Sequence, residues 1–216
     1  MIRYTIHEER INTWSHAAGI LLGVVVGTVF LVWCMRADDG WAATAISLYL
    51  AGMLGSYIAS TVYHALPSTW HLRTIMRKFD HAAIYWHIAG SYSPITLLAM
   101  KDVGAWGWGL FCFVWLCAIA GTIASFINLK EHSHLETVWY VLMGLSVLVA
   151  FRPLMQCVDT QAIVWLIAEG VMYITGAVFY AVGPRRPYAH SVFHFFVLAG
   201  SLCHIACVWD VLSKYL

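Results

Sequence analysis

Residues 14–35 read WSHAAGILLGVVVGTVFLVWCM, a run without a single aspartate, glutamate, lysine or arginine. About 20 consecutive apolar residues are enough for an α-helix to cross the hydrocarbon core of a bilayer. The run is too long for the core of a signal peptide, and no small-x-small cleavage site accompanies it. We therefore expect this segment to remain in the protein as its first membrane span.

Six similar apolar runs follow along the chain, near residues 42–66, 79–100, 104–128, 135–152, 161–183 and 188–212. They are continuously apolar rather than alternating, so helices, and not the strands of a β-barrel, satisfy their backbone groups in lipid. The sequence therefore predicts an all-α, polytopic membrane protein, a bundle of seven transmembrane helices that forms one domain over residues 1–216.

The composition excludes other classes of protein. Hydrophobic residues make up 61% of the chain and charged residues 11%, which a soluble domain of this length could not accommodate. The formal net charge is +1, and no basic cluster is large enough to neutralise a run of phosphates, so nucleic-acid binding has no support. Membrane lipid is the expected partner, and the sequence identifies no protein partner.

The distribution of lysine and arginine predicts the orientation, because cytoplasmic loops carry an excess of both. In a seven-span arrangement, eight of the twelve fall on the side of the N-terminus: Arg3, Arg10, Arg73, Arg77, Lys78, Lys130, Arg185 and Arg186. The opposite side holds Arg36, Lys101, Arg152 and Lys214. We therefore expect a multi-pass protein of the cytoplasmic membrane, in a bacterium the inner membrane, with its N-terminus inside.

Two features concern packing rather than chemistry. Gly19, Gly23 and Gly27 lie on one face of the first span and should let another helix approach closely. Pro94, in the sequence GSYSP, should kink the third span, with nearby hydroxyls bonding to the carbonyls it leaves free.

A group of ionisable residues carries the chemistry, because such side chains are expensive in a bilayer and usually face the bundle interior. Ser60 and His64 lie four apart at the end of the second span, and Asp80 opens the third. His190 and His194 lie four apart at the start of the seventh, on one helix face. The predicted topology puts all of them at the same membrane depth, on the cytoplasmic side, although the charge count did not require it.

Three imidazoles and one carboxylate match the ligand set of a zinc ion, with three nitrogens binding directly and water in the fourth position. We expect His64, His190 and His194 to be the ligands. Asp80 would bind or orient the water, and Ser60 would support the site from outside the ligand set. The alternative is that these histidines are hydrogen-bonded contacts between helices near the membrane interface.

Further polar groups lie within the spans. His16, at the start of the first span, is either a supporting group of the site or a plain interfacial residue. Glu169 lies well inside the sixth span, and the sequence identifies no partner for it. Four others share helix faces with the residues above and either line a polar cavity that leads from the metal into the membrane or make interhelical hydrogen bonds: His87, Ser91, Ser201 and His204.

The motifs STVYH, FDHAAIY, GSYSP, HSVFH and a later LCH resemble those of the hemolysin III family, from Asn12 to about Cys207. That family is related to the progestin and adipoQ receptors and, more distantly, to the alkaline ceramidases. The resemblance implies a seven-span fold with a cytoplasmic-side zinc bound at His64, His190 and His194, and with Asp80 contacting the zinc-bound water. All the motif residues are present.

Zinc with one open position makes a hydroxide nucleophile near neutral pH, so we expect a hydrolase, with Asp80 as the general base. A lipid-like amide or ester could enter such a site sideways from the bilayer, as the resemblance to ceramidases also implies. Two alternatives remain. The zinc is structural in a non-catalytic sensor or regulator of membrane state, or the protein is a cytolytic pore-former, which the stable apolar bundle favours least.

Overall fold

The computed structural model describes residues 4–128, 135–183 and 186–216. Helices account for nearly all of them, and the described residues include no strand. In chain order the helices are α1 (Ile6–Arg36), α2 (Gly40–Ala65), α3 (His71–Pro94), the π-helix η1 (Ile95–Ala99), α4 (Trp106–Asn128), α5 (Leu135–Leu145), the 3-10 helix η2 (Ser146–Ala150), α6 (Phe151–Cys157), α7 (Thr160–Val182) and α8 (Ala189–Tyr215).

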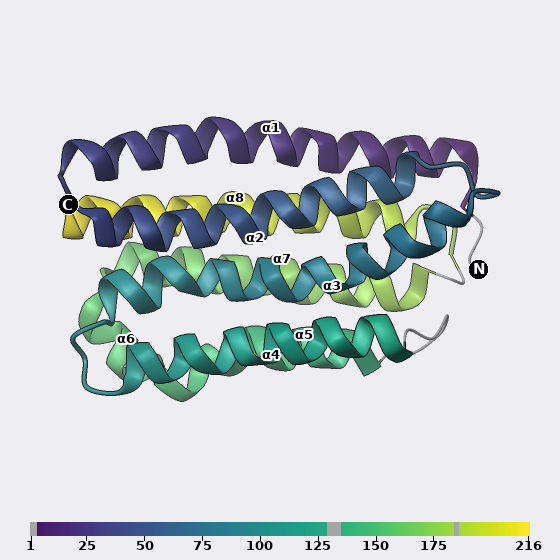
Figure 1. Cartoon of the computed structure of the whole chain (residues 1–216). Coiled ribbons are helices and arrows are strands. Elements are labelled where there is room, and N and C mark those ends of the chain that lie inside the picture. Colours follow the sequence, from purple (N-terminus) through teal and green to yellow (C-terminus); the bar gives the residue numbers. More distant parts are fainter. Residues whose placement is uncertain (1–3, 129–134, 184–185) are drawn as a thin grey trace.

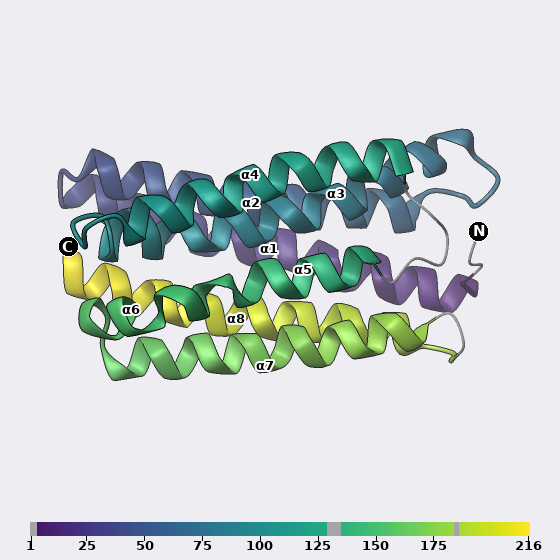
Figure 2. The same ribbon diagram turned by 90° about the horizontal axis from the view of Figure 1, so that it is seen from below.

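The long helices lie side by side in one bundle, with α1 beginning at one end and α8 finishing at the other (Figures 1 and 2). Among the described residues, six helical segments are long and apolar enough to cross a membrane. The prediction of an all-helical, multi-pass membrane protein is therefore confirmed. The remaining long helix, α3, falls outside that set, because its first half carries Arg73, Arg77, Lys78 and Asp80.

Three boundaries differ from the predicted spans. Helix α1 begins at Ile6 rather than near residue 14, because Thr5 and Glu8 form a capping box that starts the helix in the polar segment. Helix α3 begins at His71 rather than near residue 79. Its first turns carry charged residues, which a search for apolar runs leaves out of the span. The fifth segment stays helical to Cys157, beyond residue 152, through the 3-10 turn η2.

The third helix changes its hydrogen-bond pattern after Pro94. The π-helical turn η1 follows it directly, and the Thr96 hydroxyl donates to the Tyr92 carbonyl at 2.8 Å. Ser93 donates to the Ala89 carbonyl at 3.2 Å. Proline lacks the N–H that would bond to the Gly90 carbonyl, and these two hydroxyls bond to neighbouring carbonyls rather than to that one.

The glycines of α1 pack against α2. A Cβ atom added to Gly19 would lie 2.6 Å from the ring of Tyr57, and one added to Gly23 would lie 2.7 Å from the Leu54 side chain. This close approach brings the start of α1 against the end of α2, where the candidate site lies.

Glycine also sets the contact between α2 and α3. A Cβ atom on Gly52 would collide with the backbone carbonyl of Trp86, which cannot move without the whole helix, whereas one on Gly55 would meet open space. We expect Gly52→Ala to destabilise the protein by about 1–3 kcal/mol through overpacking. Thermal unfolding in detergent would measure it, with Gly55→Ala as the matched control. Equal unfolding midpoints for the two variants would contradict the observed packing.

Candidate metal centre

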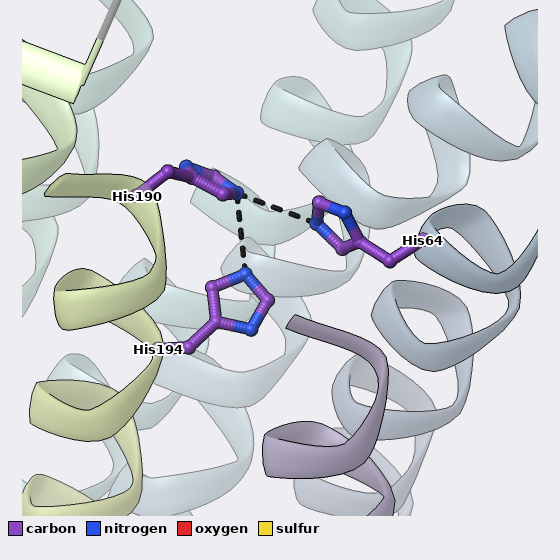
Figure 3. A group of neighbouring side chains, drawn as sticks. All are labelled: His64, His190 and His194. Carbon is purple, nitrogen blue, oxygen red and sulfur yellow. Dashed lines mark hydrogen bonds between the residues drawn. The ribbon is translucent and has the colours of Figure 1, made fainter. Parts of the chain in front are cut away.

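Three histidine rings meet where the end of α2 lies beside the start of α8 (Figure 3). His64 is in the last turn of α2, and His190 and His194 are in the first two turns of α8. The Nε2 atom of His190 lies 3.3 Å from Nε2 of His64 and 3.2 Å from Nε2 of His194. All three side chains are buried. Because Nε2 of His190 contacts Nε2 of the other two rings, the same nitrogen of each ring lies at one shared position (Figure 3).

This spacing fits a single tetrahedral ion. Zinc binds imidazole nitrogen at about 2.0–2.1 Å, so two such ligands of a tetrahedral ion lie about 3.4 Å apart. Two of the three pairs, His190 with His64 and His190 with His194, are 3.3 and 3.2 Å apart, and all the ligand atoms lie within 4.8 Å of one another. Three nitrogen donors leave the fourth position of such an ion open.

The outer nitrogen of His64 is held by an acidic residue of α1. Nδ1 of His64 lies 2.7 Å from Oε2 of Glu9, and Arg73 donates to the other oxygen of the same carboxylate. Arg73 also donates to the carbonyl of Leu66 at 2.5 Å, which fixes its position beside the end of α2. Because a carboxylate only accepts hydrogen bonds, Nδ1 carries a proton, and in the neutral ring the lone pair therefore lies on Nε2, which faces the shared position.

The outer nitrogen of His194 is held in the same way by Ser15. The Ser15 hydroxyl lies 3.2 Å from Nδ1 of His194 and donates its only proton to the carbonyl of Asn12 at 2.9 Å. It therefore accepts a hydrogen bond from Nδ1, and Nε2 of His194 is again a lone pair. The side-chain oxygen of Asn12 accepts a hydrogen bond from Ser191 at 2.6 Å, which ties α1 to α8.

These tautomers argue against the alternative in which the three histidines form only hydrogen bonds with one another and bind no metal. His64 and His194 both present an acceptor to His190, whose Nε2 carries at most one proton and can donate to only one of them. A cation at the shared position satisfies all three nitrogens. The donor set is therefore better matched to a metal ion than to a chain of hydrogen bonds.

His190 is covered by aromatic rings. Tyr4 stacks on it with ring centres 4.8 Å apart and an interplanar angle of 18°, and the Tyr180 ring centre is 5.8 Å away. Burial raises the pKa of the Tyr4 hydroxyl, so it stays protonated at neutral pH and can donate a hydrogen bond.

Asp80 and Ser60 lie in the wall of a cavity of about 430 Å³ that His190 and His194 also line. Ser60 is buried and Asp80 is half-buried. Asp80 is not one of the three residues whose ligand atoms lie within 4.8 Å of one another. It faces the same space without joining the close group of nitrogens.

All but one of the other predicted polar residues line the same cavity. His16 stacks on His194 with ring centres 3.8 Å apart, and neither of its ring nitrogens has a hydrogen-bond partner among the described residues. Ser201 does not line the cavity, and its hydroxyl lies 2.7 Å from the hydroxyl of Tyr57 and 3.2 Å from that of Tyr173. The remaining predicted residues line the cavity together with His16: His87, Ser91 and His204.

Glu169 has a partner that the sequence did not identify. Its Oε2 atom lies 2.8 Å from Nδ1 of His204, and both side chains are buried. The sequence places both residues inside spans, but the rotation of α7 against α8, which turns them towards each other, follows from packing alone.

The sequence also missed the residues that hold the outer nitrogens. Asn12 and Ser15 precede Gly19 by seven and four residues, so the face that packs against α2 could have suggested them. Glu9 and Arg73 lie outside the predicted spans, and no spacing pattern marks them.

Removal of the carboxylate at Glu9 should weaken metal binding. Glu9→Gln keeps the size but removes the charge that holds the proton on Nδ1 of His64, and changes of this kind weaken metal affinity about 10–100-fold. Competition with a chelating dye would measure the zinc affinity. Glu136→Gln is the matched control, because Glu136 also lies 2.8 Å from a histidine nitrogen, that of His81, outside the cluster. An equal affinity for both variants would exclude a supporting role for Glu9.

Comparison with known proteins gives a consistent result. A family model described as "Haemolysin-III related" matches residues 4–205. "Hemolysin-3" of Bacillus cereus is 31% identical over 205 residues, covering 94% of this chain and 91% of the relative. The human "Monocyte to macrophage differentiation factor" is 29% identical, with 97% and 87% covered. An "ADIPOR-like receptor" of Saccharomyces cerevisiae is 27% identical, with 94% and 71% covered. The resemblance that the motifs indicate is confirmed.

Proposed function

The chain belongs to the haemolysin III family, and from this membership we propose that it binds one zinc ion and hydrolyses a lipid-like amide or ester. The ligands in this proposal are His64, His190 and His194. The observation that carries it is the convergence of three Nε2 atoms at 3.2 and 3.3 Å, two of them with their outer nitrogens held by Glu9 and Ser15.

A zinc ion held by three imidazoles keeps one position for water and lowers the pKa of that water towards neutrality. Asp80 supplies the base in this proposal. Its carboxylate faces the cavity beside His190 and His194 and is half-buried. It accepts the proton that water releases on attacking the substrate carbonyl, and it returns that proton to the leaving amine or alcohol. Tyr4, which stacks on His190, offers a protonated hydroxyl to the same space.

The cavity supports a lipid-like substrate. It continues from His190 and His194 between α3, α5, α7 and α8, and apolar side chains form much of its wall, among them Ile84, Ile88, Leu148 and Phe151. An apolar chain gains by burial there, while the amide or ester lies at the polar end near Asp80. Access from the bilayer would let such a molecule reach the site without crossing water.

The proposal includes seven spans, with α3 as the seventh, and a cytoplasmic N-terminus in a bacterial inner membrane. Helix α1 begins and α8 finishes at opposite ends of the bundle, as an odd number of crossings requires (Figures 1 and 2). The lysine and arginine count supports the orientation, although Arg3, Lys130 and Arg185 lie outside the described residues.

A structural zinc in a non-catalytic sensor is the second candidate. It is favoured by the way the cluster joins α2 to α8 while α1 holds the outer nitrogens through Glu9 and Ser15. In this case zinc removal would lower the unfolding temperature of the helix bundle, and no substrate would be turned over.

Metal removal tests the proposed hydrolysis. The purified protein would be reconstituted in vesicles with a panel of lipid amides and esters, and release of fatty acid would be measured. We expect release to stop after treatment with a chelator and to return when zinc is added. Release that continues unchanged in the chelator would contradict the proposal, and an absence of release with zinc bound would favour the structural role.

A further inference from the structure

A second buried polar site lies in the middle of the bundle, at the Glu169–His204 pair. Glu169 is in α7 and His204 in α8, ten residues beyond His194 and therefore about 15 Å further along the helix axis. The side chains are 11% and 2% exposed. Ionisable groups at such a depth are energetically expensive and commonly functional, and the proposed hydrolysis does not use this pair.

The hydrogen bonds indicate how the pair is charged. Nδ1 of His204 lies 2.8 Å from Oε2 of Glu169, and Nε2 of His204 is buried without a partner among the described residues. An imidazolium would leave a charged N–H group buried and unbonded, which is unfavourable. A neutral ring leaves only a lone pair. With a neutral His204 the ring proton lies on Nδ1, and an ionised Glu169 would receive no compensating charge from its partner.

The surroundings of Glu169 do not balance that charge either. Of the lysine and arginine residues that the structure describes, only Arg77 lines the cavity, and it lies one turn before Asp80 at the metal-centre end. Tyr92 and Tyr173 line the cavity as well. Glu169 is the more exposed member of the pair and also lines this space, so a cation that enters the cavity can reach its carboxyl group.

We propose that the Glu169 end of the cavity binds the ammonium group of an amphiphilic amine, whose apolar chain lies along the cavity towards the metal centre. The ammonium N–H groups donate to the carboxylate in charge-assisted hydrogen bonds. Tyrosine rings attract cations, and Tyr92 and Tyr173 both line this cavity. This site is separate from the zinc chemistry, because it uses none of the residues assigned to hydrolysis.

The test compares two ligands of equal chain length, dodecylamine and dodecan-1-ol, with the full-length protein in phosphatidylcholine nanodiscs at neutral pH. Apparent Kd values come from the shift of the unfolding midpoint with ligand concentration. In the wild type we expect the amine to bind at least about tenfold more tightly than the alcohol. In Glu169→Gln the two should bind within about twofold of each other, since the charge is lost.

Three further variants make the result specific. Glu136→Gln removes a carboxylate that also pairs with a histidine but does not line the cavity, and it should keep the preference for the amine. His204→Asn should keep it too, because the Asn amide can still donate to Glu169, so this variant is informative even if Glu169→Gln unfolds. His190→Ala should keep it as well, which separates this site from the proposed zinc site.

Two results would overturn the proposal. One is equal binding of amine and alcohol by the wild type. The other is a preference for the amine that persists unchanged in folded Glu169→Gln, since the cation would then be bound elsewhere or by the lipid.

Discussion

Replacement of His190 by alanine is expected to weaken zinc binding about a thousandfold. Apparent binding free energies for structural zinc are about 10–16 kcal/mol, so one ligand of three is worth about 4 kcal/mol, or about a thousandfold in Kd. The Nε2 atom of His190 lies between those of His64 and His194, so its loss leaves no nearby donor to replace it. Competition against a chelator of known affinity would measure the change in the purified protein.

The matched control for this variant is His87→Ala. His87 is a buried histidine of α3 that lines the cavity and lies outside the cluster of ligand atoms. It should leave the zinc affinity within about twofold of the wild type, because its ring packs against Tyr57 and Tyr173 and it supplies no ligand atom. Equal weakening in both variants would mean that zinc affinity follows the general stability of the bundle, and would remove His190 from the ligand set.

The Asp80→Asn variant is expected to retain zinc and lose hydrolysis. Asparagine keeps the size of the side chain but cannot accept a proton from water, and loss of general base catalysis lowers turnover about 10²–10⁴-fold. Because Asp80 lines the cavity without belonging to the close group of ligand atoms, the zinc content should not change. Initial rates of fatty-acid release and elemental analysis of the same preparation would measure both quantities.

The result for Asp80→Asn also distinguishes a zinc-dependent hydrolase from a sensor with structural zinc. If zinc is structural, Asp80→Asn leaves the protein unchanged, and His194→Ala lowers the unfolding temperature without affecting any turnover. If Asp80→Asn loses zinc together with activity, Asp80 is a ligand rather than a base, and the assignment of its role is wrong.

Much of the fold follows from the sequence, because a bilayer requires long apolar segments whose backbone groups are bonded within each helix. The residues at which helices begin were harder to predict from the sequence. Thr5 and Glu8 start α1 inside a polar segment, and the charged turns of α3 continue a helix that hydropathy alone places later. In both cases local hydrogen bonding and charge, rather than apolar length, decide where the helix begins.

The three histidines could be grouped from the sequence because helix periodicity and topology both constrain depth. His190 and His194 share a face by their spacing, and the direction of each span brings His64 to the same level. The structure brings these three together.

Rotation about a helix axis is not constrained in this way, which explains what the sequence missed. Glu9 meets His64, and Glu169 meets His204, only because particular helix faces pack against each other. The glycines of α1 are the one sequence feature that indicates such a face, and Ser15 lies on it.

The central claim is that the three histidines hold a metal ion, and the zinc content of the wild-type protein tests it most directly. Elemental analysis of folded protein, purified in detergent without added metal or chelator, should find one zinc per chain. A well-folded preparation with no zinc above background, and no zinc retained after loading and dialysis, would contradict the claim.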